Sequence, residues 1–199
     1  MAEVVMCSDK RDIYPGMFSG FNPMDWWCFT VNTPRIFFAD RDLVETNEDV
    51  VQWIPYCINH DDEAEERRYL TYHRKGTEGR LHGFRSLGIG GHVSNLDVPI
   101  KGAGFCETIA TALRRECDEE FPTEADIPQL QGTIYEGTTS VGRVHIGLVF
   151  TRRVALYREH NYGEEILLPQ WRFHNELLSM EDSFENWSRI LIPLLPKFQ

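Results

Sequence analysis

The sequence predicts a mixed α/β sandwich. Three observations support this class: several short runs bounded by turn residues read as strands, one of which alternates cleanly over residues 144–151, an amphipathic helix interrupts those runs, and a second apolar helix face lies near the C-terminus. Because strands, a helix, more strands and a last helix follow one another, a mixed sheet is favoured over a regularly alternating doubly wound one.

The elements are expected in the following order. A short helix within residues 40–51 precedes the first strand. Strands are expected at residues 51–59, 68–74, 85–93, 130–137, 142–153 and 164–173. The third of these runs into glycines, after which a helix is expected from about Thr108. Asp182 and Glu185 have the spacing of a capping box, which predicts a last helix ending near Pro193.

The first 50 residues are rich in aromatic residues, glycine and proline, and show no clear period. They are interpreted as an N-terminal extension (residues 1–50) that wraps the core or forms part of an interface, while residues 51–199 form the main domain. The aromatic residues at the N-terminus suggest a homodimer.

Composition and charge exclude several classes of protein. The chain has 199 residues, 42% of them hydrophobic, which is typical of a globular protein able to bury a core. Its net charge of -11 argues against general nucleic-acid binding, which requires a basic face. Its five cysteines include no C-x-x-C pair, and no apolar stretch is long enough to span a membrane. A cytoplasmic protein without membrane contact is expected.

The helix from Phe105 to Phe121 carries three carboxylates that border its apolar stripe. At about 100° per residue, Glu116, Glu119 and Glu120 flank the stripe, which is formed by Ile109, Ala110, Leu113, Cys117 and Phe121, whereas Arg114 and Asp118 lie opposite it. Like charges at this spacing repel. Either the carboxylates form a solvated acidic face, or they hold a divalent cation such as Mg²⁺ or Mn²⁺.

The same stretch resembles the signature of the Nudix hydrolases, G-x5-E-x7-R-E-U-x-E-E-x-G-U, in which U is a bulky apolar residue. The five charged positions are occupied by Glu107, Arg115, Glu116, Glu119 and Glu120, and Cys117 serves as U. The strands on either side fit the α/β/α sandwich with a mixed sheet that the family adopts.

This chain departs from the signature at two positions. Lys101 stands where the family has its first glycine, so Gly91 is matched to that glycine, with residues 93–102 as an insertion. The alternative is that Gly90 and Gly91 only form a turn. At the other end of the motif, Phe121-Pro122 replaces the usual x-Gly, which changes how the helix ends.

The resemblance implies a hydrolase that cleaves a phosphoanhydride bond in a nucleoside diphosphate-linked substrate. Glu116, Glu119 and Glu120 are then the expected Mg²⁺ ligands (Mn²⁺ is the alternative), with the carbonyl of Gly91 as a further ligand. Glu107 and Arg115 are expected to fix the loop against the helix, Arg115 through a two-point contact. Selectivity is expected from the insertion and from residues 1–50.

The general base stays open at this stage. Glu116 and Glu120 are candidates, and the segment 158–165 offers Glu159, Glu164 and Glu165, for each of which a solvated surface position is the favoured interpretation. Cys106 is interpreted as a small buried thiol, because the sequence places no base beside it. Trp26, Trp27, Trp53 and Tyr56 could stack a base, but each is more often a core residue and none is assigned to the site.

Two other functions compete with hydrolysis. A non-catalytic nucleotide sensor on the same fold would be favoured by loss of the metal carboxylates, all of which are present. His92 follows Gly90-Gly91, in a stretch similar to the Cys-Gly-His of isopentenyl diphosphate isomerases, where the histidine binds metal. The isomerase cysteine is missing, so that chemistry is the weaker alternative.

Overall fold

The computed structural model describes residues 3–13, 19–62, 66–75, 83–100, 104–155 and 160–198. The strands are β1 Val4–Asp9, β2 Gly20–Pro23, β3 Phe37–Asp40, β4 Val50–Asp61, β5 Arg68–Arg74, β6 Arg85–Ser86, β7 Gly88–Gly90, β8 Gln129–Tyr135, β9 His145–Arg153 and β10 Ile166–Phe173. The α-helices are α1 Lys10–Ile13, α2 Trp26–Val31, α3 Arg41–Val44, α4 Phe105–Glu120, α5 Ser140–Arg143, α6 His174–Ser179 and α7 Asn186–Leu191, and the 3₁₀ helices are η1 Asn95–Asp97, η2 Glu181–Ser183 and η3 Ile192–Lys197.

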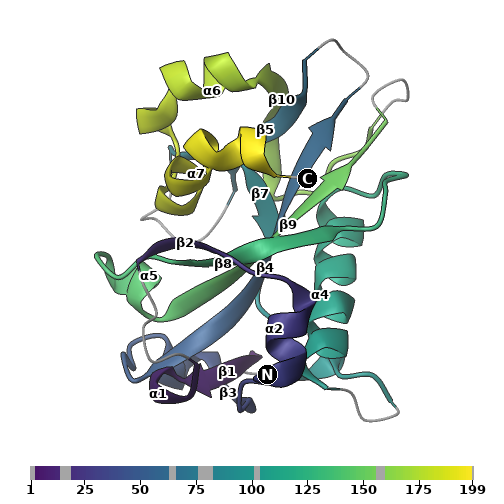
Figure 1. Cartoon of the computed structure of the whole chain (residues 1–199). Coiled ribbons are helices and arrows are strands. Elements are labelled where there is room, and N and C mark those ends of the chain that lie inside the picture. Colours follow the sequence, from purple (N-terminus) through teal and green to yellow (C-terminus); the bar gives the residue numbers. More distant parts are fainter. Residues whose placement is uncertain are drawn as a thin grey trace. The chain divides into compact units, whose positions relative to one another are not determined.

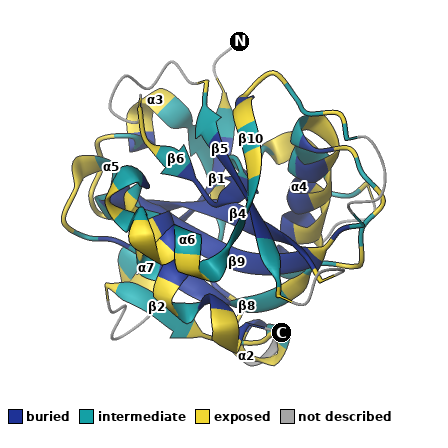
Figure 2. Cartoon of the chain, turned by 90° about the horizontal axis from the view of Figure 1, so that it is seen from above, coloured by how far each residue is buried: buried dark blue, intermediate teal, exposed yellow. Residues whose placement is uncertain are grey.

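The strands of the described residues form one large sheet with the order β10-β5-β4-β9-β8-β2 (Figure 1). Beside this path, β1 pairs with β3 and β4, β6 pairs with β5, and β7 pairs with β4. The predicted fold class is therefore confirmed as mixed α/β with a large sheet. Strands β4 and β9 are almost wholly buried (Figure 2), as their apolar sequences require.

The chain forms two compact units. The first comprises Met1–Tyr56, Gly90–Arg115 and Leu130–Val149, and the second comprises Cys57–Ile89, Glu116–Gln129 and Phe150–Gln199. The long elements β4, β9 and α4 contribute residues to both units.

In the first unit, N-terminal residues enter the sheet. Strand β1 pairs antiparallel with β4, with Cys7 opposite Gln52. The rings of Phe29 and Trp53 contact Phe105 at centroid distances of 5.1 and 4.7 Å, so α2, β4 and the first turn of α4 share one aromatic core. The predicted domain boundary near residue 50 stays a prediction.

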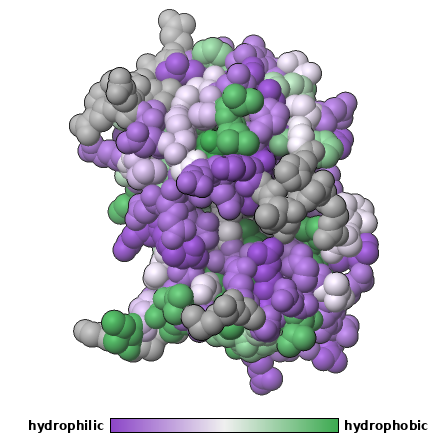
Figure 3. Space-filling model, turned by 180° about the vertical axis from the view of Figure 1, so that it is seen from behind, coloured by the Kyte–Doolittle hydropathy of each residue, from purple (hydrophilic) through white to green (hydrophobic). Residues whose placement is uncertain are grey.

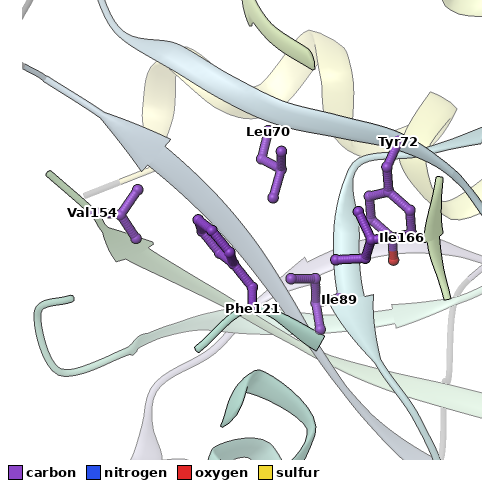
Figure 4. Close-up of a cluster of buried hydrophobic side chains, with 6 residues drawn as sticks. All are labelled: Leu70, Tyr72, Ile89, Phe121, Val154 and Ile166. Carbon is purple, nitrogen blue, oxygen red and sulfur yellow. The ribbon is translucent and has the colours of Figure 1, made fainter. Parts of the chain in front are cut away.

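In the second unit, apolar side chains from three strands and from the residues that directly follow β9 and α4 pack together (Figure 4). This cluster consists of Leu70, Tyr72, Ile89, Phe121, Val154 and Ile166. Phe121 stacks on Tyr162 with ring centroids 5.0 Å apart. Phe121 occupies the variable position x that directly precedes the signature glycine, and its ring anchors the end of α4 in the core.

Most predicted elements agree with the structure to within a few residues, and two details differ. Helix α4 begins at Phe105 rather than near Thr108. The last helix is capped by Glu185, whose carboxylate accepts from the backbone N–H groups of Trp187 and Ser188, while Asp182 lies in η2. The capping box predicted from Asp182 and Glu185 was therefore wrong, because Phe184 adopts an extended conformation between them. No helix of the described residues has the length and apolarity that crossing a membrane requires.

Candidate active site

Helix α4 places its carboxylates along the edge of its buried face. Glu116 and Glu120 are partly buried and Glu119 is exposed, whereas Arg114 and Asp118 on the opposite side are exposed as predicted. The buried residues of α4 and its exit are Phe105, Thr108, Ile109, Ala112, Leu113, Cys117 and Phe121.

The prediction that Ala110 belongs to the apolar stripe was wrong. Ala110 is exposed and Ala112 is buried. Phe105, at the start of α4, packs against Phe29 and Trp53. Ala112 lies two turns after Phe105 on the same side of the helix, so the buried face includes Ala112 rather than Ala110.

Glu120 is the most constrained of the three carboxylates. Its Oε2 atom is buried and has no hydrogen-bond partner among the described residues. Burial raises the pKa of Glu120, and the charges of Glu165 and Glu116 raise it further. A carboxylate oxygen buried without a partner carries a free-energy cost that a bound cation would offset.

The loop formed by residues 160–165, directly before β10, approaches Glu120 closely. The backbone N–H of Gly163 donates to the Glu120 carbonyl at 2.8 Å. A Cβ atom at Gly163 would lie only 2.6 Å from the Glu119 carbonyl oxygen and 2.8 Å from Glu120 Cα. Glycine is therefore required for the loop to pass this close to the helix.

Two of the three distant base candidates lie on this loop. Glu165 is 58% exposed and its charge raises the pKa of Glu120, which indicates that the two carboxylates are neighbours. Glu164 is 96% exposed, as the solvated alternative predicts. Glu159 lies outside the described residues.

Arg115 makes the predicted two-point contact, and the described partner is Asp97. Its Nε and one terminal nitrogen donate to the two carboxylate oxygens of Asp97 at 2.8 and 2.9 Å. The same terminal nitrogen donates to the His92 carbonyl at 3.0 Å. Asp97 is only 2% exposed and also accepts from the Ser94 backbone N–H.

Arg115 thus fastens the inserted segment to α4. Glu107, the other residue expected to fix the loop, is exposed, and its Oε2 would lie 3.0 Å from a Cβ at Gly104. Sequence reasoning missed Asp97. The N-cap motif formed by Ser94 and Asp97 was the available signal.

The glycine pair has a packing role at Gly90. A Cβ there would lie 2.1 Å from the Pro55 carbonyl oxygen, so β7 can approach β4 only with glycine at this position. Gly91 and His92 directly follow the strand, and Gly91 is half-buried. The role of the Gly91 carbonyl as a ligand stays a prediction.

Three further residues meet in the first unit. The ligand atoms of Glu45, His92 and His145 all lie within 4.8 Å of one another. Sequence reasoning singled out His92 and missed the other two, because about 50 residues separate each from the next along the chain.

Of the four aromatic candidates, two are core residues. Trp53 and Tyr56 are buried, whereas Trp27 is 71% exposed and Trp26 is intermediate. Burial raises the pKa of the Cys106 thiol, and the charge of Glu107 raises it further. A raised thiol pKa argues against a thiolate nucleophile at this position.

Comparison with known proteins adds independent evidence. No family model matches the chain. It is 30% identical over 153 residues to Protein YmaB of Bacillus subtilis (strain 168), covering 72% of this chain and 70% of YmaB. It is also 30% identical to Tm1382, a candidate Nudix hydrolase of known crystal structure, with a TM-score of 0.77 over 98% of this chain and 99% of Tm1382.

A more distant structure shares the fold alone. The NUDIX domain of Shewanella oneidensis NrtR, solved in complex with ADP-ribose, is 11% identical. It has a TM-score of 0.54 and covers 87% of this chain and 99% of that domain.

Proposed function

The chain belongs to the Nudix hydrolase family, and from this membership we propose that it hydrolyses a phosphoanhydride bond in a nucleoside diphosphate-linked substrate with the help of a divalent cation. Mg²⁺ is the proposed ion, with Mn²⁺ as the alternative. The ligands are carboxylates of Glu116, Glu119 and Glu120, joined by the Gly91 carbonyl.

The observation that carries this proposal is the buried Oε2 of Glu120, for which the described part of the chain provides no hydrogen-bond partner. It lies at the end of the signature helix, and the charges of Glu116 and Glu165 reach the same carboxylate. Carboxylate oxygens of this kind suit a hard cation. When bound, the cation would supply charge neutralisation for phosphate oxygens and acidify the attacking water.

The residues of the chain have separate roles in this proposal. Arg115 holds the segment that contains His92 and Asp97 against the signature helix, so it positions the loop rather than the substrate phosphate. Glu107, in the first turn of the same helix, helps to fix this loop in the proposal. Glu120 is a candidate for accepting the proton of the attacking water, because burial and neighbouring charges raise its carboxyl pKa, which favours that task at neutral pH. Glu165, whose charge acts on Glu120, is a second candidate because of its position.

A substrate panel tests the proposal. Purified protein is assayed with Mg²⁺ and, separately, with EDTA, against nucleoside triphosphates, dinucleoside polyphosphates, nucleotide sugars and ADP-ribose. ADP-ribose is included because the NrtR domain was solved with it. Metal-dependent release of a nucleoside monophosphate or of a nucleoside diphosphate supports hydrolysis.

The same panel separates the competing functions. Tight binding of one of these nucleotides without turnover would point to a sensor. Conversion of isopentenyl diphosphate to its isomer would point to isomerase-like chemistry. Either result, without hydrolysis of any member of the panel, contradicts the proposal.

A further inference from the structure

We propose that Glu45, His92 and His145 form a second metal site, which takes a transition metal ion of the Zn²⁺ type rather than Mg²⁺. The three residues come from the end of α3, the segment after β7 and the start of β9, and all belong to the first unit. None of them is among the carboxylates of α4.

The outer nitrogen of the His145 ring has a hydrogen-bond acceptor, and that of the His92 ring lies near a carboxylate but outside hydrogen-bond distance. Nδ1 of His145 lies 2.8 Å from the Val141 carbonyl oxygen, which can only accept, so Nδ1 carries the proton and Nε2 is left with its lone pair. Nδ1 of His92 lies 3.8 Å from a Glu3 carboxylate oxygen. Histidine ligands in metal sites commonly donate their second N–H to a carbonyl or a carboxylate in this way.

The inner nitrogens have the spacing of two ligands on one ion. Nε2 of His92 and Nε2 of His145 are 3.2 Å apart. Two nitrogens that each lie about 2.05 Å from a tetrahedral Zn²⁺ are separated by about 3.3 Å. A direct hydrogen bond between the rings, with His92 donating, would give a similar distance. A metal titration distinguishes a shared ion from this hydrogen bond.

Glu45 supplies the third ligand. One of its carboxylate oxygens, Oε2, accepts from Gln52 Nε2 at 3.3 Å and lies 3.7 Å from Arg41 Nε. Because Arg41 also pairs with Glu3 at 2.8 Å, one guanidinium is shared between two carboxylates beside the site. The carboxylate needs to turn toward the imidazole nitrogens to complete the ligand set.

The ligand types select the class of metal. Two imidazole nitrogens and one carboxylate oxygen suit Zn²⁺ and its neighbours, whereas Mg²⁺ prefers oxygen ligands alone. Three protein ligands leave the fourth tetrahedral position for water or for a substrate oxygen.

The surrounding backbone holds the ligands in place. The His92 carbonyl accepts from Arg115, and Val93, the next residue, exchanges backbone hydrogen bonds with β1 and β4. The His145 ring is 6% exposed, and the His92 side chain is 12% exposed. The two histidines are therefore held in place and mostly shielded from water, while the Glu45 carboxylate must turn to complete the site.

Metal binding to the full-length, tag-free protein tests this inference. The protein is stripped with EDTA, dialysed and titrated with Zn²⁺ by calorimetry, and the bound metal is counted by mass spectrometry. One equivalent is expected, and the Co²⁺ form should lack a thiolate charge-transfer band, because this site contains no cysteine. His92→Gln and His145→Gln should weaken binding at least 100-fold, and Glu45→Gln should weaken it about tenfold.

Matched controls are available in the same chain. Glu48→Gln removes a carboxylate three residues from Glu45 that pairs with Arg143 at the surface, and His73→Gln removes a partly exposed histidine of β5. Both should bind Zn²⁺ as the parent does. Circular dichroism checks that each variant is folded, and His92→Gln, at the less buried position, keeps the test valid if His145→Gln does not fold.

The outcome is separable from the proposed function. Glu120→Gln should retain the full Zn²⁺ stoichiometry, because it leaves the two histidines and Glu45 intact. Unchanged Zn²⁺ affinity in His92→Gln and His145→Gln, or a parent protein that binds none, would overturn the inference and leave the rings joined by a hydrogen bond. Neither result would bear on the signature helix.

Discussion

At the scale of single residues, Glu120 combines two unfavourable features. One of its oxygens is buried without a partner among the described residues, and two other carboxylates act on it. Each feature disfavours the charged form when nothing else is bound. Both become favourable beside a cation, so substitutions of Glu120 give opposite results with and without metal.

The first prediction concerns turnover. Glu120→Gln preserves the shape of the side chain and removes its charge. It should lower kcat/KM with Mg²⁺ at least about 100-fold for whichever substrate the panel identifies. Asp118→Asn is the matched control, because Asp118 is an exposed acid of the same helix on the opposite side, and it should change kcat/KM less than about twofold. Full activity in Glu120→Gln would remove the metal-site interpretation of this helix.

The second prediction concerns pH. Because the pKa of Glu120 is raised above its ordinary value of 4.5, the folded state holds this proton more tightly than the unfolded state does. The contribution of Glu120 to stability is therefore lost as pH rises from 4.5 through the folded-state pKa. In EDTA, Glu120→Gln should melt above the parent at about pH 7, and the difference should vanish below about pH 4. Thermal melts across this range measure it, and a difference that is independent of pH would contradict the assignment.

At the scale of elements, the insertion is fastened to the signature helix through one buried carboxylate. Asp97 accepts two hydrogen bonds from Arg115 and one from the Ser94 backbone. Removing a charged partner from a buried contact of this kind leaves the remaining donors unsatisfied.

The third prediction follows from this contact. Asp97→Asn should lower the free energy of unfolding by about 1–3 kcal/mol, as measured by urea denaturation. The control is Asp126→Asn, which breaks an ion pair with Arg153 in which both side chains are more than half exposed, and it should cost less than about 1 kcal/mol. Equal losses in the two variants would show that Arg115 does not depend on Asp97.

The fourth prediction concerns the loop beside Glu120. Gly163→Ala would place a methyl group against the backbone of Glu119 and Glu120, where neither side can yield easily. We expect a loss of about 1–3 kcal/mol in unfolding free energy, together with lower activity, because the loop that carries Glu165 must shift. Gly137→Ala is the control, since its nearest neighbour is the Tyr135 ring at 3.2 Å, a side chain that can move. A silent Gly163→Ala would contradict the close approach.

At the scale of the whole molecule, the hydropathy of the surface and the net charge of the chain bear on the choice of partner. Figure 3 shows one face on which hydrophilic residues predominate and hydrophobic residues occur in small separate groups. The net charge of -11 disfavours anionic partners in general, so binding of a phosphate-rich substrate requires a local positive charge such as a bound cation. The homodimer expected from the N-terminal aromatic residues stays a prediction.

The fifth prediction uses this linkage. Mg²⁺ that binds the folded state alone should stabilise the parent by about 2.7 kcal/mol at 100 times its Kd. For a chain of this length, that corresponds to a rise in Tm of roughly 5–10 °C. Differential scanning calorimetry with Mg²⁺ or with EDTA measures the effect. The rise should be smaller in Glu120→Gln and unchanged in Asp118→Asn; a parent whose Tm does not respond to Mg²⁺ would argue against the site.

The sequence by itself determined the features that depend on neighbours along the chain. Strand-type runs bounded by turn residues identified the main strands, with 68–74 matching β5 residue for residue, and spacing alone placed Glu116, Glu119 and Glu120 on one edge of a helix. The charged spacing of the signature also indicated the family. These patterns can be read because helix and strand periods are local properties of the backbone.

Only the tertiary structure decided which distant residues meet. It paired Arg115 with Asp97, brought Gly163 against Glu120, and assembled Glu45, His92 and His145 from three segments. The capping box and the burial of Ala110 were mispredicted for the same reason. The start of the last helix, after the buried Phe184, and the buried face of α4 depend on packing against other elements. Contacts of this kind depend on sheet register and on the packing of side chains far apart in sequence, and spacing along one chain carries no record of either.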